Sequence, residues 1–190
     1  AIELALDHLI KHGHRRIGFI TWGMPDDRVA NPVDIVDVHF QRLVNAKLRR
    51  FEYLMTGRGL LENMSAFCML NEQPDSSQRR LASYLQDANA PTAVICDGDF
   101  RAQAVYLAAA HVGLAVPEKL SVVGIGDTPW TRQLAPELTS VNMGEEAAAD
   151  LAARLCLGQE PVTQLRCKIV PHLVTRASVA ELRPGAEISG

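Results

Sequence analysis

The chain lacks features that mark several common classes of protein. Its 190 residues carry a formal net charge of only −3, and the acidic and basic residues are interspersed, so no basic face is available to neutralise a run of phosphates. No apolar run approaches the length of a membrane span, and the first residues lack the order of regions found in a signal peptide. We therefore expect a cytoplasmic chain that makes no use of a membrane and does not by itself bind DNA tightly.

Cysteine is also scarce. Cys68, Cys96, Cys156 and Cys167 are scattered without a Cys-x-x-Cys pair, which favours reduced thiols over a disulfide framework or a zinc site. No Gly-x-Ser-x-Gly motif is present, so the nucleophile turn of the α/β-hydrolases is missing. We expect no cofactor, no metal and no enzymatic activity.

The chain does contain a regular alternation of helical and strand patterns. Helices are expected at 2–12, 45–60, 76–88, 100–113 and 144–158, and strands at 16–21, 66–70, 92–96, 120–125, 138–143 and 165–170. Most of these strands are near-continuous apolar runs, which indicates burial on both faces of a parallel sheet. The pattern predicts an α/β fold with three layers and a doubly wound parallel sheet, interrupted by a long polar loop at 22–38 and a shorter one at 128–137.

Acidic residues follow two of the expected strands, in "VICDGDF" and "SVVGIGDTPW". The second segment is not a dinucleotide fingerprint, because it has no third glycine and no helix directly after the turn. Ligands bind at the carboxyl ends of parallel strands, so Asp99 and Asp127 are expected to face one crevice. Two alternatives stay open: these aspartates, and Asp97 above all, cap turns, or Asp97, Asp99 and Asp127 bind Mg²⁺ in an enzyme.

Two further features have a functional and a structural interpretation. The basic run "HGHRR" follows an expected helix, where cations complement the helix dipole, and it is too short for a nucleic-acid site. Trp22 and Trp130 both lie in loops just past strands, where an indole ring either stacks on a ligand or covers the core.

Three segments together resemble the LacI/GalR family of bacterial transcription regulators. They are "HLIKHGHRRIGFIT", "PTAVICDGDFRAQAVYLAAAHVGLAVPEKLSVVGIGDTPWTRQLAPELTSV" and "PHLVTRASV", in the family's order and spanning almost the whole chain. The resemblance implies a two-lobed, periplasmic-binding-protein-like type I fold of which this chain supplies mainly the C-terminal lobe. It also implies a first lobe and a helix-turn-helix headpiece that are absent from this chain.

The domain boundaries follow from the resemblance. Residues 1–180 are expected to be a fragment of the effector-binding domain, with a flexible tail at 181–190. Within the fragment, 13–143 and 161–176 form the C-terminal lobe, and the helices at 1–12 and 144–158 flank or contact the first lobe.

The resemblance also implies a set of ligand-binding positions. The family's pocket arginine falls on Lys47, and its Asn-Asp pair falls on Gly98 and Asp99. The aspartate that usually grips a sugar hydroxyl falls on Gly126, and the one after it is Asp127. Gln73 lies near the position of the family's aromatic stacking residue, for which Trp22 or Trp130 is a possible substitute.

The resulting hypothesis is the ligand-sensing and dimerising part of a repressor that responds to a small carbohydrate. Loss of a carboxylate at Gly126 beside a retained Lys47 favours an acidic sugar, as does the similarity of this turn to the gluconate-repressor branch. A neutral ligand held by the other lobe, and a phosphosugar bound through Lys47 and Arg28, stay open.

The implied partners are a second copy of the chain, through "FRAQAVYLAAAHVG" and "TPWTRQLAP", and operator DNA, only through the headpiece. The alternative class is a periplasmic-type solute-binding protein for sugar transport.

Overall fold

Strands and helices alternate through the residues that the computed structural model describes, 1–22, 35–69, 74–159 and 168–182, with side chains described in all of these except 35–45 and 74–75. The strands are β1 (Ile17–Trp22), β2 (Met64–Met69), β3 (Ala93–Cys96), β4 (Ser121–Gly126), β5 (Thr139–Asn142) and β6 (His172–Val174). The helices are α1 (Ile2–Lys11), α2 (Ile35–Gly57), α3 (Pro74–Leu85), α4 (Asp99–His111) and α5 (Glu145–Cys156), with short 3-10 helices η2 (Leu61–Asn63) and η3 (Pro129–Arg132). None of the helices in these ranges combines the length and apolarity needed to cross a bilayer.

The strands form one sheet in the order β2-β1-β3-β4-β5-β6. All neighbouring pairs from β2 to β5 are parallel, and β6 pairs with β5 in the antiparallel direction. The chain runs from β1 outward to β2 and then returns to β3 on the other side of β1, which is doubly wound topology. The four residues of β3 are all buried, as are the first five of β1. Burial on both faces of the sheet therefore explains these apolar runs, as the sequence predicted.

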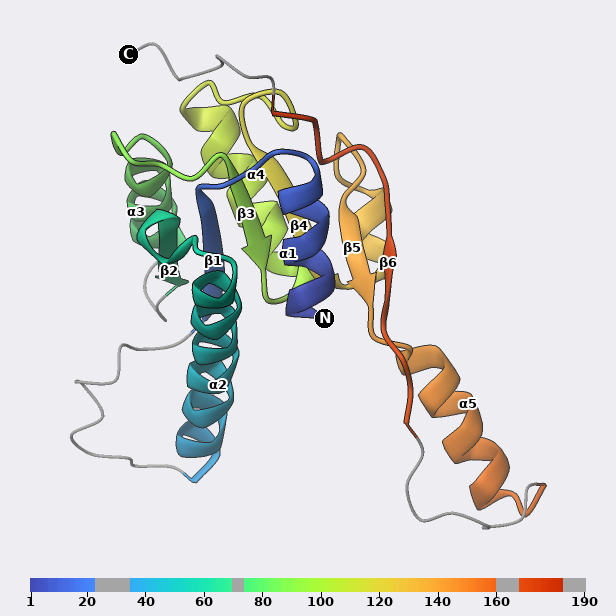
Figure 1. Ribbon diagram of the computed structural model, residues 1–190. Helices are drawn as coiled ribbons and strands as arrows, with labels where there is room; N and C mark the ends of the chain where they lie inside the picture. The colour runs from blue at the N-terminus through green and yellow to red at the C-terminus, as the bar shows by residue number, and fades with distance from the viewer. Residues whose placement is uncertain (23–34, 70–73, 160–167, 183–190) are drawn as a thin grey trace.

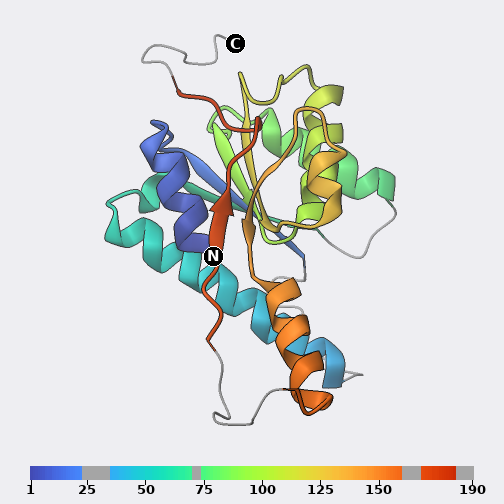
Figure 2. The ribbon, with the colours of Figure 1, turned by 90° about the vertical axis from the view of Figure 1, so that its right-hand side faces the viewer.

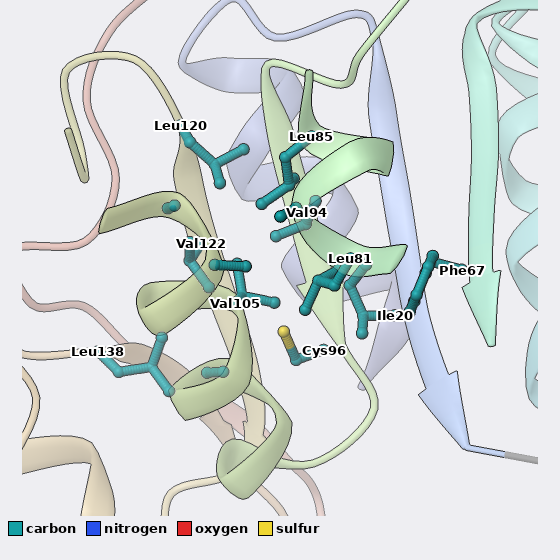
Figure 3. Packing of buried hydrophobic residues seen from close by; sticks show 14 residues of the cluster. Ile20, Phe67, Leu81, Leu85, Val94, Cys96, Val105, Leu120, Val122 and Leu138 are labelled. Atoms are coloured by element: carbon teal, nitrogen blue, oxygen red, sulfur yellow. The ribbon is translucent and has the colours of Figure 1, made fainter. Parts of the chain in front are cut away.

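Helices cover both faces of the sheet and give the predicted three layers (Figure 2). On one face α1 and α2 pack through a cluster that includes Leu6, Leu9 and Phe51. On the other face α3 and α4 pack on β1, β3 and β4 through Leu81, Val105 and their neighbours (Figure 3). In Figure 1, α5 and the first half of α2 extend beyond the end of the sheet toward which the parallel strands point, and no residue of α5 is buried.

The C-terminal segment ties the sheet to the end of α1. The ring of His14, buried at 2% exposure, lies with Nδ1 3.0 Å from Thr92 Oγ1 and Nε2 3.1 Å from the carbonyl oxygen of Ala180. Arg15 donates from Nη1 to the carbonyl oxygen of Ile10 at the end of α1. The basic run after α1 therefore has a structural role. Arg15 binds a carbonyl oxygen at the C-terminal end of the helix, where a positive charge complements the helix dipole.

Helix α2 begins earlier than the sequence indicated. The long loop predicted at 22–38 overlaps its first turn, because α2 starts at Ile35 and not at residue 45. Residues 23–34 of that loop lie outside the described ranges. The start of this helix was missed because prolines precede it and its first residues are β-branched, which lowers the helix propensity of the segment. Its apolar residues nevertheless recur at helical spacing.

The last strand lies elsewhere than predicted. The segment 165–170 was expected to be a strand; 165–167 lie outside the described ranges, 168–170 have no regular structure, and β6 comprises His172–Val174. Val170 is 71% exposed and Ile169 is half-buried, so this apolar pair is not part of a fully buried strand. An edge strand of three residues is set by pairing with β5, which a local apolar pattern does not show. The flexible tail was expected at 181–190. Leu182 donates its N–H to the carbonyl oxygen of His12, and 183–190 lie outside the described ranges.

Candidate functional site

The carboxyl ends of the parallel strands bring most of the predicted site residues to one edge of the sheet. Trp22 ends β1, Gly126 ends β4, Asp127 follows it, and Asp99 is the first residue of α4. Lys47 lies on the covering helix α2. Gln73, like Arg28, lies outside the described residues.

A cavity of about 410 Å³ opens at this edge. Two predicted residues, Lys47 and Gly126, line it. The other residues around it are Ala1, Ile2, Glu3, Arg50, Asp97, Ile125, Met143 and Glu145. The structure therefore joins Lys47 and Gly126 in one cavity with an acidic residue, Asp97, that had been interpreted mainly as a cap.

Asp97 and Lys47 form an ion pair at the bottom of this cavity. Lys47 Nζ lies 3.6 Å from Asp97 Oδ2, and Thr21 donates its hydroxyl to the same oxygen at 2.7 Å. The side chain of Lys47 is 36% exposed, whereas that of Asp97 is 1% exposed. Lys47 is thus the member of the pair that a ligand can reach.

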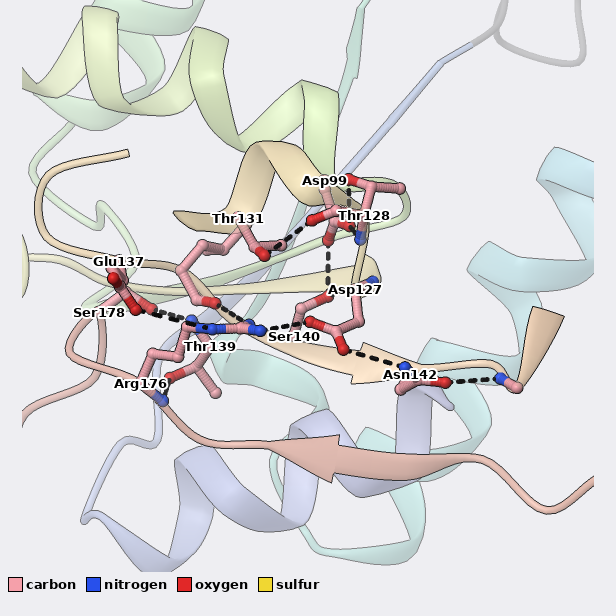
Figure 4. A network of polar contacts seen from close by, with 12 residues as sticks. Asp99, Asp127, Thr128, Thr131, Glu137, Thr139, Ser140, Asn142, Arg176 and Ser178 are labelled. Atoms are coloured by element: carbon pink, nitrogen blue, oxygen red, sulfur yellow. Dashed lines mark hydrogen bonds and ion pairs between the residues drawn. The ribbon is translucent and has the colours of Figure 1, made fainter. Parts of the chain in front are cut away.

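Asp99 is committed to the protein interior (Figure 4). Its Oδ2 accepts hydrogen bonds from the backbone N–H and the hydroxyl of Thr128, and its Oδ1 accepts one from Ser140 at 2.6 Å. At 2% exposure it joins α4, the turn after β4, and β5. Asp99 therefore has the structural role of an aspartate that caps a turn, which was one of the two interpretations of these residues. A role for Asp99 in ligand binding stays a prediction.

Asp127 is held by Arg176, which forms with Ser178 the Arg-x-Ser motif of the segment "PHLVTRASV". Its Oδ1 accepts a hydrogen bond from Arg176 Nη2 at 2.6 Å, and its Oδ2 accepts one from Asn142 at 2.9 Å. Burial alone would raise the pKa of Asp127, but these hydrogen bonds and the positive charges of Arg176 and Arg132 hold it below its ordinary value. Asp127 also lines a second cavity of about 450 Å³ on the η3 side of the strand ends.

The depressed pKa of Asp127 makes a pH-dependent contribution to stability. The contribution is fully present above the ordinary value of 3.8 and is lost as the pH falls through the lower pKa of the folded protein. We expect Asp127→Asn to lower the free energy of unfolding clearly at pH 7 and much less near pH 3, in urea titrations at both values. A difference that is the same at the two pH values would contradict the Arg176–Asp127 pairing.

Arg176 contributes to this edge but was not predicted to do so, although its Arg-x-Ser motif is present in the sequence. Arg176 also donates to the carbonyl oxygen of Leu138 at 2.8 Å, and Ser178 bridges the backbones of Thr139 and Val122. The motif therefore fastens β4 and β5 together. Within the described ranges, no three His, Cys, Asp or Glu side chains gather as a metal site would require.

The fold agrees with that of a known family. Residues 6–179 match the model of the periplasmic binding protein-like domain. The chain belongs to this family, and the resemblance to the effector-binding domain of LacI/GalR regulators is confirmed.

Particular relatives support the same assignment. The chain is 29% identical over 188 residues to the HTH-type transcriptional repressor PurR of Glaesserella parasuis, covering 94% of this chain and 51% of the relative. A LacI-family regulatory protein from Corynebacterium glutamicum is similar with a TM-score of 0.72 at 22% identity, over 95% of this chain and 65% of that one. A LacI-family regulator from Enterococcus faecium with bound ribose has a TM-score of 0.68 at 20% identity, over 96% and 63%. The chain spans about half the length of the curated relative.

Proposed function

We propose that this chain is the effector-sensing part of a cytoplasmic transcriptional repressor, and that its effector is a small acidic sugar. The observation that carries this proposal is the cavity lined by Lys47, whose side chain is 36% exposed, and Gly126. Gly126 stands where the resemblance to the family places a hydroxyl-binding aspartate. A missing carboxylate lowers the electrostatic cost of placing an anion there. The ribose bound to the similar Enterococcus faecium regulator supports a carbohydrate of this size.

A ligand between two lobes changes their relative angle and hence the DNA affinity of the headpieces they carry. The helix-turn-helix type of the Glaesserella parasuis relative supports this mode of action. In this proposal operator DNA contacts the headpiece alone, which accords with the small net charge of −3 on the chain.

The proposed ligand is tested by calorimetry on the complete gene product that contains this chain. We expect gluconate to bind and Lys47→Met to weaken binding by about tenfold or more, because a charge-assisted contact is lost. Lys119→Met makes the same chemical change at an exposed residue just before β4, at the opposite edge of the sheet, and should leave the affinity unchanged. Equal affinities in Lys47→Met and Lys119→Met would exclude Lys47 from the site.

We also propose that the protein is a homodimer through α4 and η3. Phe100 and Leu107 on α4 and Trp130 on η3 are 58%, 59% and 56% exposed, and Phe100 and Trp130 line the same small depression. Large exposed apolar side chains gathered on one surface are typical of protein interfaces.

Leu107→Lys should therefore disrupt the dimer. We expect its dimer dissociation constant to rise about 30-fold or more in analytical ultracentrifugation, because a charge is buried at an apolar contact. The matched control is Leu61→Lys, since Leu61 is 50% exposed but lies on η2, away from this surface. A dimer that tolerates Leu107→Lys as well as Leu61→Lys would place the interface elsewhere.

A further inference from the structure

The carboxylate beneath the cavity has a second cationic partner. Arg101 Nη1, from the first turn of α4, lies 2.6 Å from Asp97 Oδ1, and the side chain of Arg101 is only 7% exposed. This short contact is an ion pair without hydrogen-bond geometry, because Asp97 Oδ1 and Arg101 Nε both lack a hydrogen-bond partner among the described residues. Asp97 is therefore shared between a buried guanidinium at 2.6 Å and the partly exposed ammonium of Lys47 at 3.6 Å.

The surroundings of Arg101 accommodate this arrangement. A Cβ atom on Gly98 would lie 2.7 Å from Arg101 Nη1, so the glycine leaves room for the guanidinium against the backbone. The guanidinium also lies 4.4 Å from the centre of the Phe100 ring, within the range of a cation–π contact.

The charges do not cancel at this side of the cavity. One carboxylate, Asp97, faces the two cations Lys47 and Arg101, which leaves a net charge of +1. Lys47 Nζ is too far from Asp97 for a direct hydrogen bond, so its N–H donors are not committed to that carboxylate.

Three other charged side chains line the cavity: Glu3, Arg50 and Glu145. Glu3 lies 3.3 Å from Arg50 and 3.6 Å from Arg58, so its negative charge is shared between two cations. Glu145 lines the cavity from the first turn of α5, where a carboxylate can accept hydrogen bonds from hydroxyl groups.

We infer that Arg101 is a positioning residue that sets the charge preference of the effector site. By neutralising Asp97 it leaves Lys47 as an uncompensated cation, which binds the carboxylate or phosphate group of the ligand while the hydroxyl groups face Glu145. This inference rests on the proposed function, in which the cavity holds a small carbohydrate.

The test measures charge preference in the complete gene product. Calorimetry gives the affinities of gluconate, glucose 6-phosphate and the neutral polyol sorbitol, and the readout is the ratio of anion affinity to sorbitol affinity. In the wild type the ratio for one anion exceeds about ten, and the preferred anion tells a carboxylate ligand from a phosphate ligand. Arg101→Met should lower that ratio about tenfold, because Asp97 then neutralises Lys47.

A double variant separates charge from structure. Asp97→Asn with Arg101→Met leaves Lys47 as the sole charge of the three and should restore the wild-type ratio. An Arg101→Met ratio that is unchanged, or a ratio that the double variant fails to restore, would overturn the inference even if gluconate binds.

If Arg101→Met does not fold, Asp97→Asn alone decides, since it should raise the ratio and an unchanged ratio would overturn the inference. A wild type that binds none of the three ligands, or sorbitol as well as the anions, would instead overturn the proposed acidic-sugar function and the inference with it.

Discussion

Replacing Asp99 by alanine should lower the free energy of unfolding by about 4 kcal/mol and the melting temperature by about 10 °C. The carboxylate accepts three hydrogen bonds from two residues, Thr128 and Ser140, on two different elements. Its removal leaves the backbone N–H of Thr128 and the hydroxyl of Ser140 without their acceptor. The cost is large because such groups cannot all regain water when they are buried.

Asp150→Ala is the matched control for Asp99→Ala. Asp150 also pairs with another side chain, Arg154 at 3.0 Å, but it is 64% exposed on α5. Exposed pairs of this kind contribute about 0.5 kcal/mol. Thermal unfolding followed by circular dichroism measures both variants, and similar melting temperatures would show that Asp99 does not join these elements.

The second large effect is expected at Gly124 in the middle of β4. A Cβ atom at this position would collide with Asp99 Oδ1 and would lie 2.8 Å from Leu138 Cδ2. Neither atom can move cheaply, because Asp99 is held by its hydrogen bonds and Leu138 is fully buried. Gly124→Ala should therefore cost about 3 kcal/mol in stability, as overpacking of a core does.

Gly57→Ala provides the comparison for Gly124→Ala. Gly57 is the last residue of α2, and an added Cβ atom meets nothing within 4 Å. Its melting temperature should stay the same or rise slightly, since alanine is the better helix former. If Gly124→Ala behaves in the same way in differential scanning calorimetry, the contact between β4 and Asp99 is not as tight as described.

The central strands could be predicted because each is buried on both faces and leaves an unbroken apolar run. The edges of the fold could not be predicted in this way. β6 has three residues and depends on its antiparallel partner β5, and the start of α2 contains residues with low helix propensity. The local sequence pattern predicts a strand well where both faces of the strand are buried. It predicts poorly where contacts with a neighbouring element decide the conformation.

The edge of the sheet that holds the candidate site could be predicted from the sequence, but the contacts of each acidic residue could not. The rule that ligands bind at the carboxyl ends of parallel strands leads to the edge of the sheet at which the cavity with Lys47 and Gly126 opens. Asp97 and Asp99 are two residues apart, yet Asp97 lines the cavity with Lys47 whereas Asp99 turns toward β5. Their difference depends on Arg101, Thr128 and Ser140, which the fold brings in from other segments.

The most direct test of the account is DNA binding by the complete gene product with and without its effector. Fluorescence anisotropy with the DNA that precedes its own gene should show specific binding, and gluconate should change the affinity by a factor of about 5 to 150. Lys47→Met should bind the same DNA but respond only at much higher gluconate concentration. Specific DNA binding that is insensitive to small acidic sugars, or no specific binding at all, would contradict the proposal that this chain senses an effector for a repressor.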